Sequence, residues 1–256
     1  MQGWKITMLR SAVLVVAGIL ASVVPAHGTV QAFHQVYLLG PGGTFSLDNV
    51  NGSVQVEGWE REEVEVDAVK TAKQSAADAD LVKIEVESSG GNVAVHTKYP
   101  QGSGVEVAVD FRVHVPYQAV LGEVGTVNGS VSVRGLEGGG QLHSVNGNVE
   151  VVDSGGRYSA HTTNGDIHME LHRLPVGRPM EVGTVNGSLV VALPPDASAN
   201  LAVHSLNGDF RSEMPVKTTA GQSPRVFEGT LGDGGDPVTL STVNGGIRVV
   251  VERPSV

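Results

Sequence analysis

The stretch TVNGSVSV at residues 126–133 decides how this chain can fold, because close copies of it recur along the sequence. It returns as TVNGSLVV at 184–191 and as TVNGGIRV at 242–249. Its central Asn-Gly pair occurs seven times in the 256 residues, at Asn51, Asn128, Asn146, Asn164, Asn186, Asn207 and Asn244. The intervals of 77, 18, 18, 22, 21 and 37 residues cluster near 20, which predicts one structural unit that repeats.

The flanks of the Asn-Gly pair repeat as well. Two residues before the asparagine stands a serine or threonine in six of the seven copies, with Asn49 as the exception. The second and fourth residues after the glycine are apolar in nearly every copy, and the residue between them is mostly polar. Alternation with a period of two is typical of a half-buried strand. Each unit is therefore predicted to be a strand, an Asn-Gly corner, a second strand and a less regular corner.

Two all-β folds can use such units. In an antiparallel meander or β-sandwich, each Asn-Gly would be a hairpin turn between neighbouring strands. In a single-stranded β-helix, or β-solenoid, each unit of about 18–22 residues would be one coil that pairs with the coils above and below. Identical residues at equivalent positions favour the solenoid. We expect the corner glycine to need positive φ, so that Gly147→Val destabilises the fold more than Gly139→Val.

The longer intervals predict departures from the regular coil. The interval of 37 residues indicates a degenerate copy between Asn207 and Asn244, with Pro215–Asp236 as a long loop around it. Between Asn51 and Asn128, strands are predicted at 54–57, 64–69, 82–87, 93–96 and 105–115. The segment 70–80 is rich in Ala, Lys and Asp, and predicts either a short helix that caps the first coil or a surface loop.

The repeated pattern TVNGSVxV resembles that of the DUF4097 family, a bacterial adhesin-like domain of unknown function. The resemblance is carried by Thr126–Val133, Thr184–Val191 and Thr242–Val249, with looser copies at Ser144, Thr162 and Ser205. It extends from about Gln35 to Val251. The resemblance implies a single-stranded β-helix with a right-handed turn, and no catalytic residues to carry over.

The first 32 residues have the composition of a secretory signal peptide, with two cations, no acid and an apolar run from Ala12 to Val24. Small residues allow cleavage after Gly28 or Ala32, so residues 1–32 are assigned to the signal and 33–256 to one adhesin-like β-solenoid domain. The alternative is an uncleaved anchor, but the run is shorter than the about 20 residues that a spanning helix needs. We expect an exported chain, periplasmic, cell-surface or extracellular, without a stable membrane span after cleavage.

Composition excludes several classes of function. The chain has no cysteine, which rules out disulfides, thiolate metal sites, Fe–S clusters and a cysteine nucleophile. Its formal charge of −10 becomes −12 once the leader with Lys5 and Arg10 is removed, which argues against nucleic-acid binding. The sequence contains no phosphate-binding loop, nucleophile elbow or zinc-protease motif. We expect the partner to be an envelope protein or a surface glycan, and we expect no cofactor.

Three histidines are the first candidates for chemistry. His143, His161 and His204 each stand three residues before a repeat asparagine. Stacked coils would bring the backbones of His143 and His161 to roughly 5 Å, close enough for the two rings to share a metal ion. No third ligand is evident, so a polar surface column is the favoured interpretation.

Two further features bear on function. Asp166 and Asp209 share the position after the Asn-Gly corner, where a carbohydrate-active β-helix enzyme could carry carboxylates. One copy separates them, which predicts roughly 10 Å between them, beyond the about 5–9.5 Å of glycosidase pairs. Trp59 is interpreted as an apolar cap on the first coil rather than a sugar-binding ring.

Together these observations predict no catalytic, cofactor-binding or metal-binding residue. The expected function is that of a non-enzymatic adhesin-like protein of the cell envelope or surface. An enzyme that acts on acidic polysaccharide and a periplasmic partner in envelope-stress signalling are the alternatives.

Overall fold

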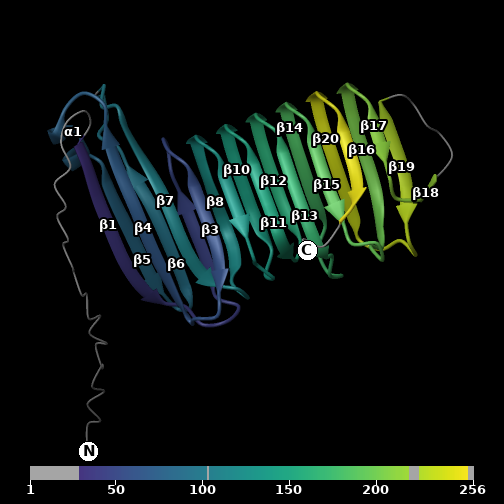
Figure 1. The fold of residues 1–256 in the computed structure, drawn as a ribbon, viewed down its shortest axis with the longest axis horizontal. Helices are drawn as coiled ribbons and strands as arrows, with labels where there is room; N and C mark the ends of the chain where they lie inside the picture. Colours follow the sequence, from purple (N-terminus) through teal and green to yellow (C-terminus); the bar gives the residue numbers. More distant parts are fainter. Residues whose placement is uncertain (1–28, 103, 219–224, 253–256) are drawn as a thin grey trace, which may run out of the picture.

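The computed structural model describes residues 29–102, 104–218 and 225–252, in which two long β-sheets face each other (Figure 1). Sheet A contains, in spatial order, β1 (Thr29–Leu38), β4 (Glu63–Ala72), β7 (Val107–Pro116), β3 (Val54–Trp59), β9 (Val131–Arg134), β11 (Val149–Gly155), β13 (Ile167–Arg173), β15 (Leu189–Leu193), β21 (Ile247–Val251) and β17 (Phe210–Ser212). Sheet B contains β18 (Val216–Thr218), β19 (Val226–Leu231), β16 (Ala199–Asn207), β20 (Pro237–Asn244), β14 (Met180–Asn186), β12 (Tyr158–Asn164), β10 (Gly140–Asn146), β8 (Val120–Asn128), β2 (Thr44–Asp48), β6 (Asn92–Lys98) and β5 (Lys83–Ser89). The helix α1 (Ala76–Leu81) lies at the end near β1.

Each repeat forms one coil of a β-solenoid, as the sequence predicts. The strand before the Asn-Gly corner belongs to sheet B, and the strand after it belongs to sheet A. Neighbouring coils pair in parallel and in register, so that His143 lies opposite His161 in sheet B and Val149 lies opposite Ile167 in sheet A. Because these pairs are parallel, the meander and the antiparallel sandwich are excluded for the repeats.

The core is a narrow column of aliphatic side chains between the sheets. The second residue after each corner glycine points inward, and the residues at this position in sheet A are 0–1 % exposed from β3 to β21: Val54, Val131, Val149, Ile167, Leu189 and Ile247. Their intervening neighbours face solvent, as the period of two predicts. Stacked valine and leucine fill the space between two facing sheets, which explains why the chain needs so few aromatic rings.

The order of the coils differs from the order of the sequence. Strand β20 pairs with both β14 and β16, and β21 pairs with both β15 and β17. The last repeat, at Asn244, is therefore inserted between the repeats at Asn186 and Asn207, and the yellow β20 stands between the green β14 and β16 in Figure 1. No coil lies between Asn207 and Asn244 among the described residues of that interval, so the predicted degenerate copy is wrong.

The segment predicted as a long loop, 215–236, instead contributes two strands in its described part. Strand β19 pairs antiparallel with β16 and with β18, and so extends sheet B beyond the last coil. Phe227 of β19 contacts Phe210 of β17, with ring centroids 4.7 Å apart. These strands cover the end of the core that lies opposite β1. The chain then returns to insert its last repeat.

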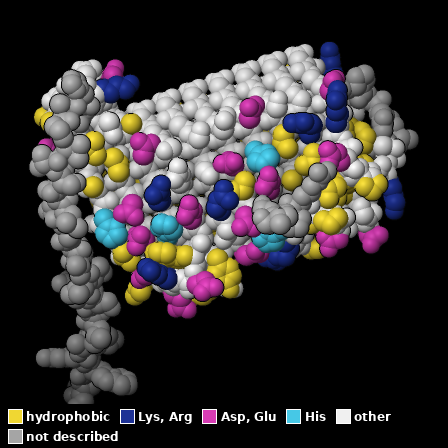
Figure 2. Space-filling view, in the orientation of Figure 1, with side chains coloured by type: hydrophobic (Ala, Val, Ile, Leu, Met, Phe, Trp, Pro, Cys, Tyr) yellow, Lys and Arg dark blue, Asp and Glu magenta, His cyan; other side chains and the backbone are white. Residues whose placement is uncertain are grey.

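The corner asparagines form a continuous hydrogen-bonded ladder. From the second asparagine of the stack onward, each side-chain amide nitrogen donates to the amide oxygen of the asparagine before it, at 2.8–2.9 Å. Along the stack the order is Asn51, Asn128, Asn146, Asn164, Asn186, Asn244 and Asn207. The ladder follows position in space, so the inserted repeat takes part in it like any other. The edge along which these neutral corners stack is white in Figure 2.

The hydroxyl two residues before each asparagine also joins neighbouring coils. Thr184, for example, is 5 % exposed, and its Oγ1 donates to the carbonyl oxygen of Gly165 at 2.9 Å. Equivalent bonds run from Thr126, Ser144, Thr162 and Thr242 to the corner glycine of the preceding coil. Asn49 replaces the hydroxyl in the first repeat, and its amide donates to the carbonyl oxygen of Val109.

The corner glycines are required for a different reason from the predicted one. Gly147 does not have positive φ, whereas Gly139 has a φ of 74°. A Cβ added to Gly147 would overlap the carbonyl oxygen of Gly129 in the adjacent coil, and a Cβ on Gly139 would overlap the backbone of Arg157. Close approach of stacked backbones therefore selects glycine at most corners, and the basis for ranking Gly147→Val above Gly139→Val is wrong.

The N-terminal end of the stack is closed by antiparallel pairing. Strand β1 pairs with β4, and β4 with β7. Helix α1 packs on β1 and β4 and places Ala79 in the core, which supports the capping interpretation of 70–80. Lys70 is 9 % exposed, and its ammonium donates to the carbonyl oxygen of Val82 at 2.7 Å. No helix in the described part of the chain is long and apolar enough to cross a membrane.

Candidate functional site

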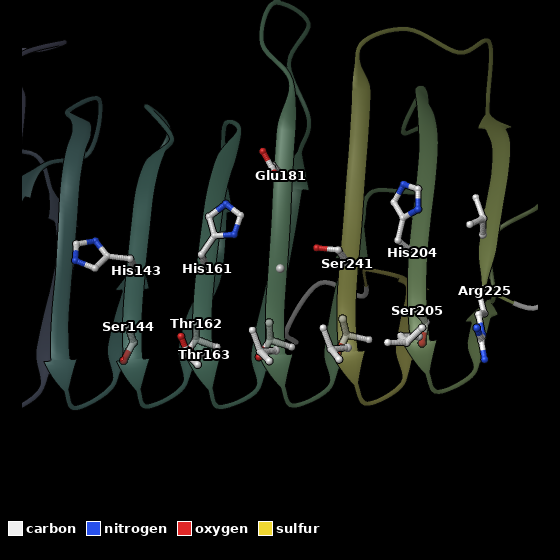
Figure 3. Close-up of a pocket in the computed structure, with 17 residues that line it drawn as sticks. His143, Ser144, His161, Thr162, Thr163, Glu181, His204, Ser205, Arg225 and Ser241 are labelled. Carbon is white, nitrogen blue, oxygen red and sulfur yellow. The ribbon is translucent and has the colours of Figure 1, made fainter.

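A shallow groove of about 660 Å³ crosses the outer face of sheet B (Figure 3). It runs over β10, β12, β14, β20 and β16, and residues 225 and 226 bound it at the end of the stack formed by β16 and β19. Gly183 of β14 and Ser241 of β20 form its floor, because their side chains are small and lie between those of His161 and His204. His161 and His204 rise on either side, as Figure 3 shows.

The floor of the groove depends on the inserted repeat. In register across the strands, His161 lies opposite Gly183, Gly183 opposite Ser241, and Ser241 opposite His204. If the coils followed sequence order, His204 would lie directly beside Gly183 and the floor would be one strand wide. Insertion of β20 widens the gap between the two histidines to three strand spacings, roughly 15 Å.

The histidine column does not form a metal pair. The imidazole of His143 lies over Gly125 of β8, where an added Cβ would overlap the ring, and its Nδ1 is 3.6 Å from the carboxylate of Glu123. The ring of His161 leans the other way, over Gly183, with Nδ1 3.2 Å from a Cβ placed there. The two rings therefore diverge, and the polar surface column is the better description.

A row of exposed aliphatic side chains borders the groove on the corner side. The residue before each repeat asparagine points outward, and the side chains at Val127, Val145, Val185, Val243 and Leu206 are 37–49 % exposed. Thr163 continues the row between Val145 and Val185. The aliphatic residue before the repeat asparagine is visible in the sequence, but only the register of the strands shows that its side chain points outward. Glu181 stands on the opposite border of the groove (Figure 3).

The two aspartates considered as enzyme carboxylates are far apart. The carboxylate of Asp166 is engaged in a hydrogen bond at the corner, where its Oδ1 accepts the backbone N–H of Ser188 at 2.7 Å. Between Asp166 and Asp209 lie two coils, with Ser188 and Gly246 at the equivalent position, so the separation is three strand spacings rather than two, roughly 15 Å. This distance exceeds the range for paired glycosidase carboxylates.

Trp59 does not cap the core. Its ring lies on the outer face of sheet A and stacks on His114, with centroids 5.0 Å apart and an interplanar angle of 17°. The guanidinium of Arg61 lies 4.7 Å from the ring centroid, and the indole N–H donates to the carbonyl oxygen of Glu63 at 2.8 Å. The predicted cap is wrong, because β4, β7 and β1 extend sheet A past the first repeat.

A charged cluster joins three coils at the second, irregular corner. The carboxylate of Glu137 accepts hydrogen bonds from His172 at 2.7 Å and from the guanidinium of Arg173, and it passes over Gly155 of the coil between. Burial acts to raise the pKa of Glu137, but the hydrogen bonds and charges of Arg173 and His172 outweigh burial and lower the pKa below its ordinary value. The cluster therefore stabilises the stack above acidic pH.

A comparison with protein families confirms the resemblance carried by the repeated TVNGSVxV pattern. A family model described as Toastrack DUF4097 matches residues 44–250. Three solved structures resemble the chain over its length. A "putative cell adhesion protein" from Clostridium sporogenes is 10 % identical, with a TM-score of 0.47 over 86 % of this chain and 99 % of that one. A "putative adhesin" from Bacteroides fragilis is 11 % identical, with a TM-score of 0.40 over 86 % and 97 %.

The third structure is a "putative lipid binding protein" from Parabacteroides distasonis, 10 % identical, with a TM-score of 0.30 over 88 % of this chain and 98 % of that one. Among curated proteins, none matches the sequence significantly.

Proposed function

The chain belongs to the Toastrack DUF4097 family, and from this premise we propose that it is an exported, non-enzymatic, adhesin-like protein that contacts the cell envelope or a cell surface through the outer face of sheet B. The observation that carries the proposal is the aliphatic row beside the groove. Solvent-exposed apolar side chains that line up on a rigid surface are typical of contact sites for other molecules.

The form of this surface suits an extended partner. The row and the groove run along the stack, so a polysaccharide chain or a peptide strand could lie across β12, β14, β20 and β16 and meet the same kinds of side chain at each step. Histidines, hydroxyls and Glu181 offer hydrogen bonds on one side, and valines offer apolar contact on the other. A rigid sheet that needs no rearrangement to bind loses little conformational entropy on contact.

Export is proposed from the leader, which lies outside the described residues. Of the two cleavage positions, the one after Gly28 is preferred. Strand β1 begins at Thr29, and Ala32 pairs with Val69 in the middle of an antiparallel ladder. Cleavage after Ala32 would remove four paired residues from β1, whereas cleavage after Gly28 leaves the strand whole. N-terminal sequencing of the exported protein should begin at Thr29, and a start at Phe33 would contradict this assignment.

The binding proposal is tested with labelled protein and isolated bacterial cell envelopes. The double substitution Val185→Glu and Val243→Glu places two charges in the aliphatic row and should weaken saturable binding at least tenfold. The matched control is Val190→Glu, which alters a valine of the same coil as Val185 on the outer face of sheet A and should leave binding unchanged. Absence of saturable binding, or an equal loss in the control, would contradict the proposal, as would release of sugars from acidic glycans.

A further inference from the structure

We propose that the outer face of sheet A carries a site for a divalent transition-metal ion, formed by His34 of β1 with Glu65 and Asp67 of β4. One ligand atom from each of these side chains lies within 4.8 Å of the other two. The cluster is remote in the fold from the groove on sheet B, and the inference does not depend on the proposed function.

The register of the two strands explains why these side chains meet. His34 lies directly opposite Asp67 in the antiparallel pair of β1 and β4. Glu65 is two residues from Asp67, so both acids point to the same face, while Val64 and Val66 point into the core at 0 % exposure. Two residues on one strand and one on its neighbour therefore present three ligands to the same side. The opposite side of such an ion would be open to water.

The chemistry of the ligands selects the class of ion. One imidazole with two carboxylates suits Zn²⁺, Cu²⁺ and related first-row ions better than Ca²⁺ or Mg²⁺, which prefer sets made of oxygen alone. Without an ion, Nδ1 of His34 is 2.7 Å from the carboxylate of Asp67. An ion would take the place of the proton between these two groups and would neutralise the repulsion between Asp67 and Glu65.

A fourth side chain supports the assignment independently. His114 of β7 lies opposite Glu65, and its Nδ1 is buried without a hydrogen-bond partner. This nitrogen is 3.6 Å from Oε1 of Glu65, and the ring is fixed by its stack on Trp59. His114 is therefore a positioning residue for Glu65: β4 lies between β1 and β7, so the ring can hold the carboxylate from the β7 side while the carboxylate faces His34 on the β1 side.

One cation competes for the same carboxylates. Arg112 of β7 lies opposite Asp67 in the register, on the outer face of the sheet. Its charge lowers the attraction of the cluster for a divalent ion, because like charges repel. Replacement of Arg112 by glutamine should therefore strengthen metal binding at this cluster.

Calorimetric titration of the metal-free full chain with Zn²⁺ tests the site. We expect one saturable site that His34→Ala and Asp67→Asn each weaken at least tenfold and that Arg112→Gln strengthens. The matched control is His168→Ala, because His168 also faces outward from sheet A and contacts one acid, Glu170, at 2.8 Å. This control should bind Zn²⁺ as the parent does. His34 is exposed, so its substitution should leave the melting temperature of the metal-free chain unchanged.

Fluorescence gives a second measurement at the same place. Cu²⁺ should quench the emission of Trp59, which stacks on His114 beside Glu65, and the substitution Trp59→Phe should abolish this component while Zn²⁺ still binds. Saturable quenching that is lost in His34→Ala supports the site. Failure of both Zn²⁺ and Cu²⁺ to bind saturably, or an equal loss of binding in His168→Ala, would overturn it.

Discussion

The four coils at Asn128, Asn146, Asn164 and Asn186 stack in sequence order, whereas the last two repeats stack in reverse. Both regions use the same contacts. The ladder bond from Asn164 to Asn146 is 2.9 Å long, and the bond from Asn207 to Asn244 is also 2.9 Å long. A repeat thus recognises its neighbours by position on the coil, and nothing in the ladder distinguishes one neighbour from another. Order must come from the segments that connect the coils.

Connections at the second corner differ between the two regions. In the central coils the chain passes directly from one coil to the next. Before the last repeat the chain first forms β18 and β19. It then returns to the stack, where Asp236 contacts Arg157. The side chain of Arg157 is only 5 % exposed, and its guanidinium lies 3.5 Å from the carboxylate of Asp236. Asp236 also accepts the backbone N–H of Gly177. These contacts hold β20 at its place in the stack.

The largest expected effect comes from removing the inserted coil, with removal of an ordered coil as the control. Truncation after Asp236 removes β20 and β21 and with them four fully buried side chains, Val238, Leu240, Ile247 and Val249. At about 1.5–3 kcal/mol each, the loss amounts to about 6–12 kcal/mol, comparable with the whole stability of a typical domain. The repeats at Asn186 and Asn207 would also lose the coil that joins them. Thermal unfolding followed by circular dichroism should be less cooperative than that of the parent chain. Limited proteolysis should cut the truncated chain early between residues 190 and 236.

Deletion of Gly129–Asn146 is the matched control, since it removes one coil of 18 residues from the ordered region and joins Asn128 to Gly147. The remaining coils keep equivalent neighbours, so this chain should fold and melt cooperatively. Equal damage from both deletions would mean that the order of the coils has no bearing on stability.

The sequence predicts the structure of a single coil better than it predicts the order in which the coils stack. Alternation around each Asn-Gly pair is a local property and identifies the inward residues, such as Val131 and Val149, correctly. The place of Asn244 is not local, because every repeat offers the same groups to its neighbours. The groove floor of Gly183 and Ser241 and the cluster around His34 arise from pairing across long intervals, so the sequence alone does not place them. The alternating acids of β4 are visible in the sequence, but only the pairing of β4 with β1 brings His34 beside them.

Corner glycines should show the next largest effect and should show it equally in both regions. An added Cβ would overlap the carbonyl oxygen of Gly129 at Gly147, and that of Gly245 at Gly208. Gly147→Ala and Gly208→Ala should each lower the free energy of unfolding by about 1–3 kcal/mol, as overpacking does. Gly40→Ala is the control, because nothing lies within 4 Å of its added Cβ. Chemical denaturation measures all three, and a neutral result at Gly147 would contradict the close approach of the coils.

The buried hydroxyls allow a finer comparison. Thr184→Val, in the ordered region, and Thr242→Val, in the inserted repeat, each remove the donor to a corner carbonyl with little change of volume. Each should cost about 1–3 kcal/mol, because a carbonyl in the stack loses its partner. Thr239→Val, on the outward side of β20, should be nearly neutral. A much smaller cost at Thr242 than at Thr184 would show that the inserted repeat is held less tightly than its neighbours.

The smallest effect distinguishes the regions by pH, because the Glu137 cluster joins only ordered coils. Since the folded pKa of Glu137 is lowered by Arg173 and His172, its contribution to stability is present above the ordinary value of 4.5 and is lost as the pH falls through the lowered folded value. Glu137 is partly exposed and screened by water, so Glu137→Gln should cost about 1 kcal/mol or less at pH 7. The difference from the parent chain should shrink as the pH falls from 7 to below 4.5. Urea unfolding across this range measures it, and a difference that grows on acidification would show that Glu137 opposes stacking instead of stabilising it.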